Sequence, residues 1–338
     1  MKKAIYFFGG GILLLVLVYL LGPTAHFEAV DQKAISWDIP INKVEAYVNT
    51  KEAGVKNLKP DNEARIIWAD SVSKTKYSVV YLHGWSGSPG EGDPIHYKFA
   101  EEFGCNLYIH RFPEHGIRDS NVFLNITPRE LVESAKEAIE IGKTIGENVI
   151  LMSCSTGSTL AFYLASNNPD IHSLIAFSPN IDLADPTSDL LTKPWGLQIA
   201  KQVLGGDYRV WHGPGDVPGF WTTKYRIEGL LCLKNLVQQT MTEKTFEGIN
   251  QPIYVGYYYK DETHQDDAIS VEKIHWFWDH IATPENLRVK EAFPEAGYHV
   301  FTSRHFPVDL DAPLNSIFTF GKEKLGLKPV SKEVLILN

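Results

Sequence analysis

The stretch NVILMSCSTGSTLAFYLA, residues 148–165, decides the fold that this sequence predicts. An apolar run typical of a strand leads into a turn of small polar residues, and a helical pattern follows at once. Such a turn is crowded, so a nucleophile at its centre needs small residues two positions before and after it. Ser153 and Gly157 meet this requirement around Ser155. Ser155 would lie at a helix N-terminus, where backbone N–H groups favour a developing anion, although a serine there also suits a simple N-cap.

The same alternation of strand and helix patterns extends along most of the chain and predicts an α/β fold with a mostly parallel sheet. Thr127 is placed to cap one of the helices, with Pro128 at the first helical position and Glu130 completing a capping box. We expect strands over residues 65–68, 77–83, 106–111, 148–153, 173–178, 252–259 and 287–293, and helices over 41–52, 95–103, 127–143, 155–166 and 227–241.

The strand over residues 77–82 ends in the glycine-rich sequence HGWSGSPG, which begins at His83. Gly84 would let the backbone turn close to Ser155, so that the Trp85 N–H points inward. Together with the Thr156 N–H it would supply the two donors that a tetrahedral oxyanion needs. A plain glycine-rich turn is the alternative interpretation.

Candidate acid and base residues follow later strands. A strand, sharp turn and helix with a nucleophilic serine at the turn, called a nucleophile elbow, requires the chain order serine, acid, histidine. In the loop after residues 253–259 we favour Asp266, because Asp266-x-x-Ile-Ser resembles the D-x-x-V-P/S pattern that is common around the acid at this point. Asp261 is the runner-up. After the last strand, His299 is presented from a loop with a glycine two residues before it. His305 is the alternative base, but we expect it to lie within the next helix. His299 would take the proton of Ser155 while the aspartate orients the imidazole.

These motifs resemble those of the α/β-hydrolase superfamily over residues 65–327. A further stretch, RFPEHG at residues 111–116, is similar to a segment of the membrane-anchored hydrolases related to monoglyceride lipases and carboxylesterases. The resemblance implies a serine hydrolase that cleaves carboxylic esters, with Ser155, His299 and Asp266 as the catalytic triad and Trp85 and Thr156 forming the oxyanion hole. The chain departs from the pattern at Ser153 and Ser158, where glycines are common.

Two other classes of function stay open. The same fold hosts serine aminopeptidases and acyltransferases, and it also occurs in binding domains that carry no catalysis. The resemblance to ester hydrolases implies that the partner is a small-molecule or lipid-like ester. The two other classes of function stay open as alternatives.

Residues 4–21 form an uncharged apolar run preceded by Lys2 and Lys3. As a helix, a run of this length would span about 27 Å, close to the hydrocarbon thickness of a bilayer. The basic residues before it predict a cytoplasmic N-terminus and an exported globular part. We therefore expect residues 1–25 to be a signal anchor, a single-pass membrane helix that leaves the catalytic domain on the periplasmic or extracellular side. A cleaved signal peptide is the alternative.

Composition excludes several other classes. The 338 residues carry 32 Lys and Arg against 41 Asp and Glu, a net charge of −9 that argues against nucleic-acid binding. The cysteines are Cys105, Cys154 and Cys232, too few for a disulfide framework. Cys154 is interpreted as a small buried apolar residue. No metal-binding motif is present, so we expect no metal and no cofactor.

The expected organisation after the anchor is an N-terminal extension over residues 26–64 and an α/β core over 65–181 and 246–338. Residues 182–245 interrupt the alternation and contain Trp195, Trp211 and Trp221. A long aromatic insertion is often a lid over a pocket, and an extra packing layer is the alternative.

Overall fold

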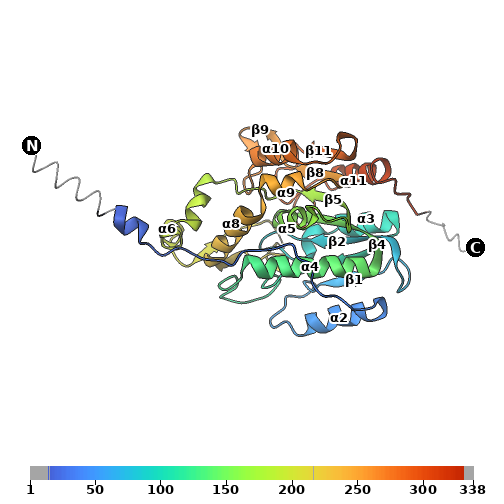
Figure 1. Cartoon of the computed structure of the whole chain (residues 1–338), viewed down its shortest axis with the longest axis horizontal. Helices are drawn as coiled ribbons and strands as arrows, with labels where there is room; N and C mark the ends of the chain where they lie inside the picture. Colours follow the sequence, from blue (N-terminus) through green and yellow to red (C-terminus); the bar gives the residue numbers. More distant parts are fainter. Residues whose placement is uncertain (1–13, 15, 216, 331–338) are drawn as a thin grey trace, which may run out of the picture.

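A seven-stranded sheet organises the chain. A computed structural model describes residues 14, 16–215 and 217–330 (Figure 1). The strand order is β1-β3-β2-β4-β5-β8-β11. All neighbouring strands are parallel except β1, which pairs antiparallel with β3 at one edge. The strands are β1 (Arg65–Ile67), β2 (Thr75–Leu82), β3 (Asn106–Ile109), β4 (Gly146–Cys154), β5 (Ile171–Phe177), β8 (Ile253–Tyr257) and β11 (Arg288–Ala292). The mostly parallel sheet expected from the sequence is confirmed.

Helices cover both faces of this sheet. Side chains of a strand point alternately to opposite faces, and in β2 Val80 and Leu82 enter one core while Val79 and Tyr81 enter the other. Because both faces are buried, the central strands read as nearly continuous apolar runs. The first core is built with α2 (Ile41–Ala53), α4 (Pro128–Ile145), α5 (Thr156–Ala165), α8 (Glu228–Thr240), α9 (Glu243–Glu247) and α10 (Val271–His280), and the second with α3 (Ile95–Phe103) and α11 (Asp311–Glu323).

The expected start of α4 is confirmed. The Thr127 side chain accepts a hydrogen bond from the Glu130 N–H (3.2 Å), and the Glu130 carboxylate accepts one from the Thr127 N–H (2.9 Å). This capping box satisfies two of the N–H groups that a helix start leaves without a partner.

The predicted insertion contains η2 (Pro186–Thr192), α6 (Gly196–Val203), α7 (Val217–Phe220) and the antiparallel pair β6 (Tyr208–Val210) and β7 (Lys224–Arg226), followed by α8. Its members pack differently. Cys232 and Leu236 of α8 are fully buried in the first core, whereas Ile199 and Val203 of α6 are exposed. The part that could act as a lid is therefore the part before α8, and the domain boundaries stay predictions.

The N-terminal extension packs against the α/β body. Val44 and Val48 of α2 are buried in the first core. Glu52, at the end of α2, forms a buried two-pronged ion pair with Arg111, with distances of 2.7 and 2.9 Å, and also accepts the Ala64 N–H. This pair fastens the extension to the loop after β3.

The apolar N-terminal run lies mostly outside the described residues. Its described part, Leu14 and residues 16–21, is exposed and leaves the body beside α6 (Figure 1). Trp195 holds the end of this segment, since its side-chain N–H donates to the Val18 carbonyl (3.0 Å) and its backbone N–H to that of Pro23 (2.8 Å). In the described part of the chain, we find no helix whose length and apolar content would let it cross a bilayer.

Candidate active site

Ser155 occupies the turn between β4 and α5. Its backbone has φ 51° and ψ −117°, a conformation that costs energy for any residue with a side chain. The Ser155 N–H donates to the Phe177 carbonyl (3.0 Å), which ties this turn to the end of β5. The Ser155 side chain makes no capping hydrogen bond to α5, so it does not serve as the simple N-cap that the sequence left open. The strained turn instead leaves the hydroxyl available at the carboxyl end of the sheet.

The small residues around Ser155 are required by close packing. A Cβ on Gly157 would lie 2.0 Å from the Leu82 carbonyl oxygen, so no larger residue fits there. Ser153 and Ser158, which stand where glycines are common, hydrogen-bond to each other with their hydroxyl oxygens 3.0 Å apart. The two departures from the expected pattern therefore satisfy one another inside the turn.

His299 and Asp266 form a direct hydrogen bond of 2.7 Å between Nδ1 and Oδ2. The Asp266 side chain is fully buried, and its other oxygen accepts the N–H groups of Ala268 (3.0 Å) and Ile269 (3.2 Å). Burial lowers the pKa of His299, but the charge and hydrogen bond of Asp266, with a smaller contribution from Glu91, leave that pKa above its usual value. With Nδ1 engaged by Asp266, Nε2 is the nitrogen that can accept a proton.

Ser155 and His299 are attached to the same strand end. Phe177, the last residue of β5, accepts the Ser155 N–H, and the hydroxyl of the next residue, Ser178, donates to the His299 carbonyl (2.7 Å). The structure thus brings the predicted nucleophile, base and acid to the carboxyl edge of the sheet. Ligands of open α/β sheets bind at this edge.

The alternative acid, Asp261, and the alternative base, His305, contact other residues. The Asp261 side chain is half exposed and pairs with His264 (2.9 Å) and Thr263 (2.8 Å) in the small hairpin formed by β9 (Tyr259–Asp261) and β10 (His264–Gln265). Hydrogen bonds from Thr263 and His264 hold the pKa of Asp261 well below its usual value. His305 precedes α11 instead of lying within it, so that expectation was wrong, and its ring stacks on Phe220 (centroids 4.0 Å apart).

The loop after β2 is held by His83. Its Nε2 accepts the Phe112 N–H (3.1 Å), so its Nδ1 carries the hydrogen and donates to the Gly84 carbonyl (2.9 Å). The Gly84–Trp85 peptide is trans, so the Trp85 N–H points away from that carbonyl. A Cβ on Gly84 would lie 2.9 Å from the Ser155 Cβ, which places the loop directly against the serine. Thr156 begins α5, so its N–H is one of the donors that a helix start leaves without an internal partner.

Glu91 is a buried acid at this site that the sequence analysis did not identify. It lies in the short helix η1 (Pro89–Gly92) and accepts the Gly84 N–H with its carboxylate (2.6 Å). A glutamate in a glycine- and proline-rich loop normally faces water, so its burial could not be read from the residue pattern.

Part of the insertion packs beside the loop. Trp221 is 3% exposed and forms an apolar cluster with Val217 and Val300, the residue after His299, against which Trp211 also packs. A backbone hydrogen bond ties this part of the insertion to the loop after β2, because the Thr222 N–H donates to the Ser86 carbonyl (2.7 Å). Two of the three tryptophans of the predicted lid, Trp211 and Trp221, therefore lie in or against one apolar cluster next to the site.

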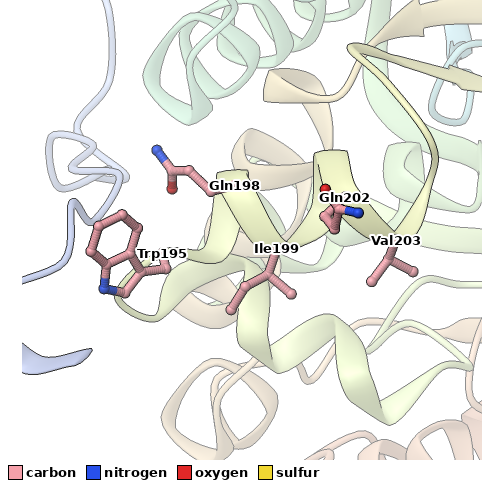
Figure 2. Close-up of a pocket in the computed structure, with 5 residues that line it drawn as sticks. All are labelled: Trp195, Gln198, Ile199, Gln202 and Val203. Carbon is pink, nitrogen blue, oxygen red and sulfur yellow. The ribbon is translucent and has the colours of Figure 1, made fainter. Parts of the chain in front are cut away.

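A hollow of about 370 Å³ lies on the outer face of α6 and contains none of the predicted site residues (Figure 2). It is lined by Trp195, Gln198, Ile199, Gln202 and Val203. Figure 2 shows these side chains along one side of the helix, with Trp195 at its start.

The described residues contain no group of three or more His, Cys, Asp or Glu side chains arranged to hold a metal. All three cysteines are free and buried. Burial holds the pKa of the Cys154 thiol well above its usual value, so this neighbour of Ser155 stays a neutral thiol.

Comparison with known proteins defines the fold. No family model and no curated sequence matches the chain. Among solved structures, a metagenome-derived lipolytic enzyme of the LipS and LipT pair aligns with a TM-score of 0.63 and 14% identity, over 78% of this chain and 98% of its own. A monoacylglycerol lipase from Paleococcus ferrophilus aligns with a TM-score of 0.53 and 16% identity, over 75% and 95%. MenH from S. aureus aligns with a TM-score of 0.52 and 15% identity, over 78% and 98%. The chain has the α/β-hydrolase fold.

Proposed function

We propose that the protein is a serine hydrolase that cleaves carboxylic esters. The observation that carries the proposal is the buried Asp266–His299 hydrogen bond of 2.7 Å, at the same sheet edge as a serine held in a strained turn. A hydroxyl at such a turn, at the same sheet edge as an imidazole whose Nδ1 is held by a carboxylate, has the parts that activate a serine nucleophile.

In the proposed reaction the Ser155 oxygen attacks the ester carbonyl while His299 Nε2 takes its proton. The N–H groups of Trp85 and Thr156 would hold the resulting oxyanion. His299 then gives the proton to the leaving alcohol, which departs and leaves an acyl group on Ser155. A water molecule, deprotonated by His299, releases the acid and restores the enzyme.

The choice of an ester as the substrate class rests on the aligned structures and on the apolar residues next to the site. The aligned structures include a lipolytic enzyme and a monoacylglycerol lipase, which favours esters over amides. The apolar cluster around Trp221 includes Val300, the residue after His299, and would border an acyl chain bound at Ser155. An aminopeptidase or acyltransferase is the second candidate, and a binding domain without catalysis is the third.

A fluorophosphonate probe tests the nucleophile, since it reacts covalently with an activated serine. We expect labelling of the wild-type protein at Ser155, and none in Ser155→Ala. A panel of p-nitrophenyl esters should be hydrolysed by the wild type, with kcat reduced by ~10³-fold or more in the variant. Labelling that persists in Ser155→Ala contradicts the assignment of the nucleophile, and labelling without ester hydrolysis contradicts the substrate class.

We also propose that the N-terminal run anchors the protein in a membrane, with the globular part on the non-cytoplasmic side. The described end of this run is apolar and exposed. It is fastened by Trp195 to α6, whose outer face carries the exposed side chains of Ile199 and Val203 (Figure 2). Tryptophan is enriched at the interface of bilayers with water, so these apolar surfaces fit one continuous contact with lipid.

A further inference from the structure

The carboxyl group of Glu91 fills the space beneath the loop that presents the Trp85 N–H. Glu91 is 1% exposed, and its Oε2 accepts both the Gly84 N–H (2.6 Å) and the Tyr81 hydroxyl (3.1 Å). A Cβ on Gly84 would lie 2.9 Å from Oε1, and a Cβ on Gly87 would lie 2.8 Å from it. The two glycines therefore leave the room that the carboxyl group occupies.

This carboxyl group is close to the reacting serine. Both Glu91 Oε1 and Ser155 Cβ lie 2.9 Å from the position of a Cβ on Gly84, so they are at most twice that distance, 5.8 Å, from each other. No step of the proposed reaction uses Glu91. A buried carboxyl group at such a distance from a nucleophile affects any charge that forms there.

Gly84 is held at both of its backbone polar groups. His83 donates to its carbonyl and Glu91 accepts its N–H. With both groups fixed, the peptide that follows has one orientation, and this orientation directs the Trp85 N–H away from His83. Without the carboxyl group, the Gly84 N–H would lose its partner and the two glycines would border a cavity, so the loop could collapse.

The groups that face Glu91 come from several elements. They are Tyr81 on β2, Cys154 at the end of β4 and His299 on the loop after β11, while His96 on α3 packs against the Tyr81 ring (4.8 Å). Burial raises the pKa values of Tyr81 and Cys154 well above their usual values and lowers the pKa of His96 to about 3, so these three groups are neutral near pH 7. His299 is the member of this set that can carry a charge in that range.

We propose that Glu91 is a positioning residue of the active site. It fixes the loop after β2, which carries the Trp85 N–H, through its hydrogen bond with Gly84, and its charge stabilises protonated His299. This inference rests on the proposed serine hydrolase. Burial raises the pKa of Glu91 to about 7, while the Gly84 hydrogen bond and the charge of His299 act in the opposite direction. The carboxyl group and the imidazole therefore titrate as a coupled pair.

The test compares Glu91→Ala and Glu91→Gln in the full-length protein with a matched control. Glu291 accepts the Tyr254 hydroxyl at 3.1 Å, the same distance as in the Glu91–Tyr81 pair, but it lies on β11 in contact with the second core, so Glu291→Gln is the control. Melting temperature, fluorophosphonate labelling, and the pH dependence of kcat and KM for a p-nitrophenyl ester are measured for each protein.

We expect Glu91→Ala to lower kcat by ~10²-fold with little change in KM, the size of effect seen when one oxyanion donor is lost. Glu91→Gln keeps an oxygen for the Gly84 N–H, so its kcat near pH 7 should stay within about tenfold of wild type. Without the charge that stabilises protonated His299, the acid limb of its kcat/KM profile should move to lower pH by about half a unit or more. Glu291→Gln should match the wild type in both respects.

Failure of the inference can be distinguished from failure of the proposed function. If Ser155 is labelled and the acid limb of Glu91→Gln coincides with that of wild type, the proposed role of Glu91 is wrong even if Glu91→Ala does not fold. A folded Glu91→Ala with kcat within threefold of wild type overturns it equally. If the wild-type protein is neither labelled at Ser155 nor active on esters, the proposed function and the role of Glu91 fall together.

Discussion

Replacing Asp266 with asparagine tests the proposed mechanism at its most constrained point. The Oδ1 atom of Asp266 accepts two backbone N–H groups, at 3.0 and 3.2 Å. An asparagine must keep its oxygen on those donors, which directs its NH₂ group at His299 Nδ1. The imidazole would then accept there and carry its hydrogen on Nε2, the nitrogen that must take the proton of Ser155. The substitution therefore preserves the shape of the site and imposes the wrong tautomer.

The expected loss is large and specific. We expect kcat/KM of Asp266→Asn on a p-nitrophenyl ester to fall by ~10⁴-fold, which corresponds to about 5.4 kcal/mol of transition-state stabilisation. In the wild type, activity should fall as pH drops through the raised pKa of His299, because protonated imidazole cannot act as a base. Removing the Asp266 charge lowers that pKa, so the acid limb of any residual activity should move to lower pH.

Asp261→Asn is the matched control, because the Asp261 side chain is 51% exposed and contacts His264 instead of His299. It should change kcat/KM by less than about twofold, as do most surface substitutions away from a site. Melting curves of both variants establish that the fold is retained. Activity of folded Asp266→Asn within tenfold of wild type, or a larger loss in Asp261→Asn, would refute the assignment of the acid.

Three further predictions concern the pocket, the turn and the anchor. Each methylene entering an apolar acyl pocket contributes about 0.8 kcal/mol, or roughly fourfold in kcat/KM, so kcat/KM of the wild type should rise with acyl chain length. Trp221→Ala or Trp211→Ala should flatten that rise and spare the shortest esters, and a chain-length dependence unchanged in both variants would reduce the cluster to a packing layer. Gly157→Ala should destabilise the fold in chemical denaturation, because its Cβ would lie 2.0 Å from a backbone oxygen, whereas Gly219→Ala, with nothing within 4 Å, should not; equal stabilities would contradict the packing. An alkaline phosphatase fused after residue 30 should be active in the producing cells, and activity of a cytoplasmic reporter at the same point would contradict the orientation.

The α/β architecture was predictable because the strongest signals are local. Strands buried on both faces appear as short apolar runs. The start of the helix at residues 128–145 is indicated by the capping box of Thr127 and Glu130. The short pieces between β5 and α8 gave no such signal. The strand β6 has three residues and α7 has four, so neither is long enough to show a period.

The candidate site was partly predictable for a different reason. Ser155, Asp266 and His299 each follow a strand, and parallel strands bring their carboxyl ends to one edge, so the strand positions alone predict that all three lie at that edge. The preference for Asp266 over Asp261 depended on a weak pattern, and the geometry now supplies a physical reason, since it is Asp266 that contacts His299. Glu91 was not predictable, because its burial depends on the path of a loop that folds over it.

The turn at Ser155 shows why a sequence motif can vary where its geometry cannot. Gly157 faces a backbone oxygen, which cannot move without disturbing β2, so this position accepts only glycine. Ser153 and Ser158 face each other instead, and a hydroxyl on one satisfies a hydroxyl on the other at 3.0 Å. The Ser153 hydroxyl also lies within hydrogen-bond distance of the Ile175 carbonyl (3.5 Å), so burying the pair of hydroxyls costs little. The two departures from the pattern thus contact each other, whereas the position whose Cβ would meet a backbone oxygen at 2.0 Å keeps the expected glycine.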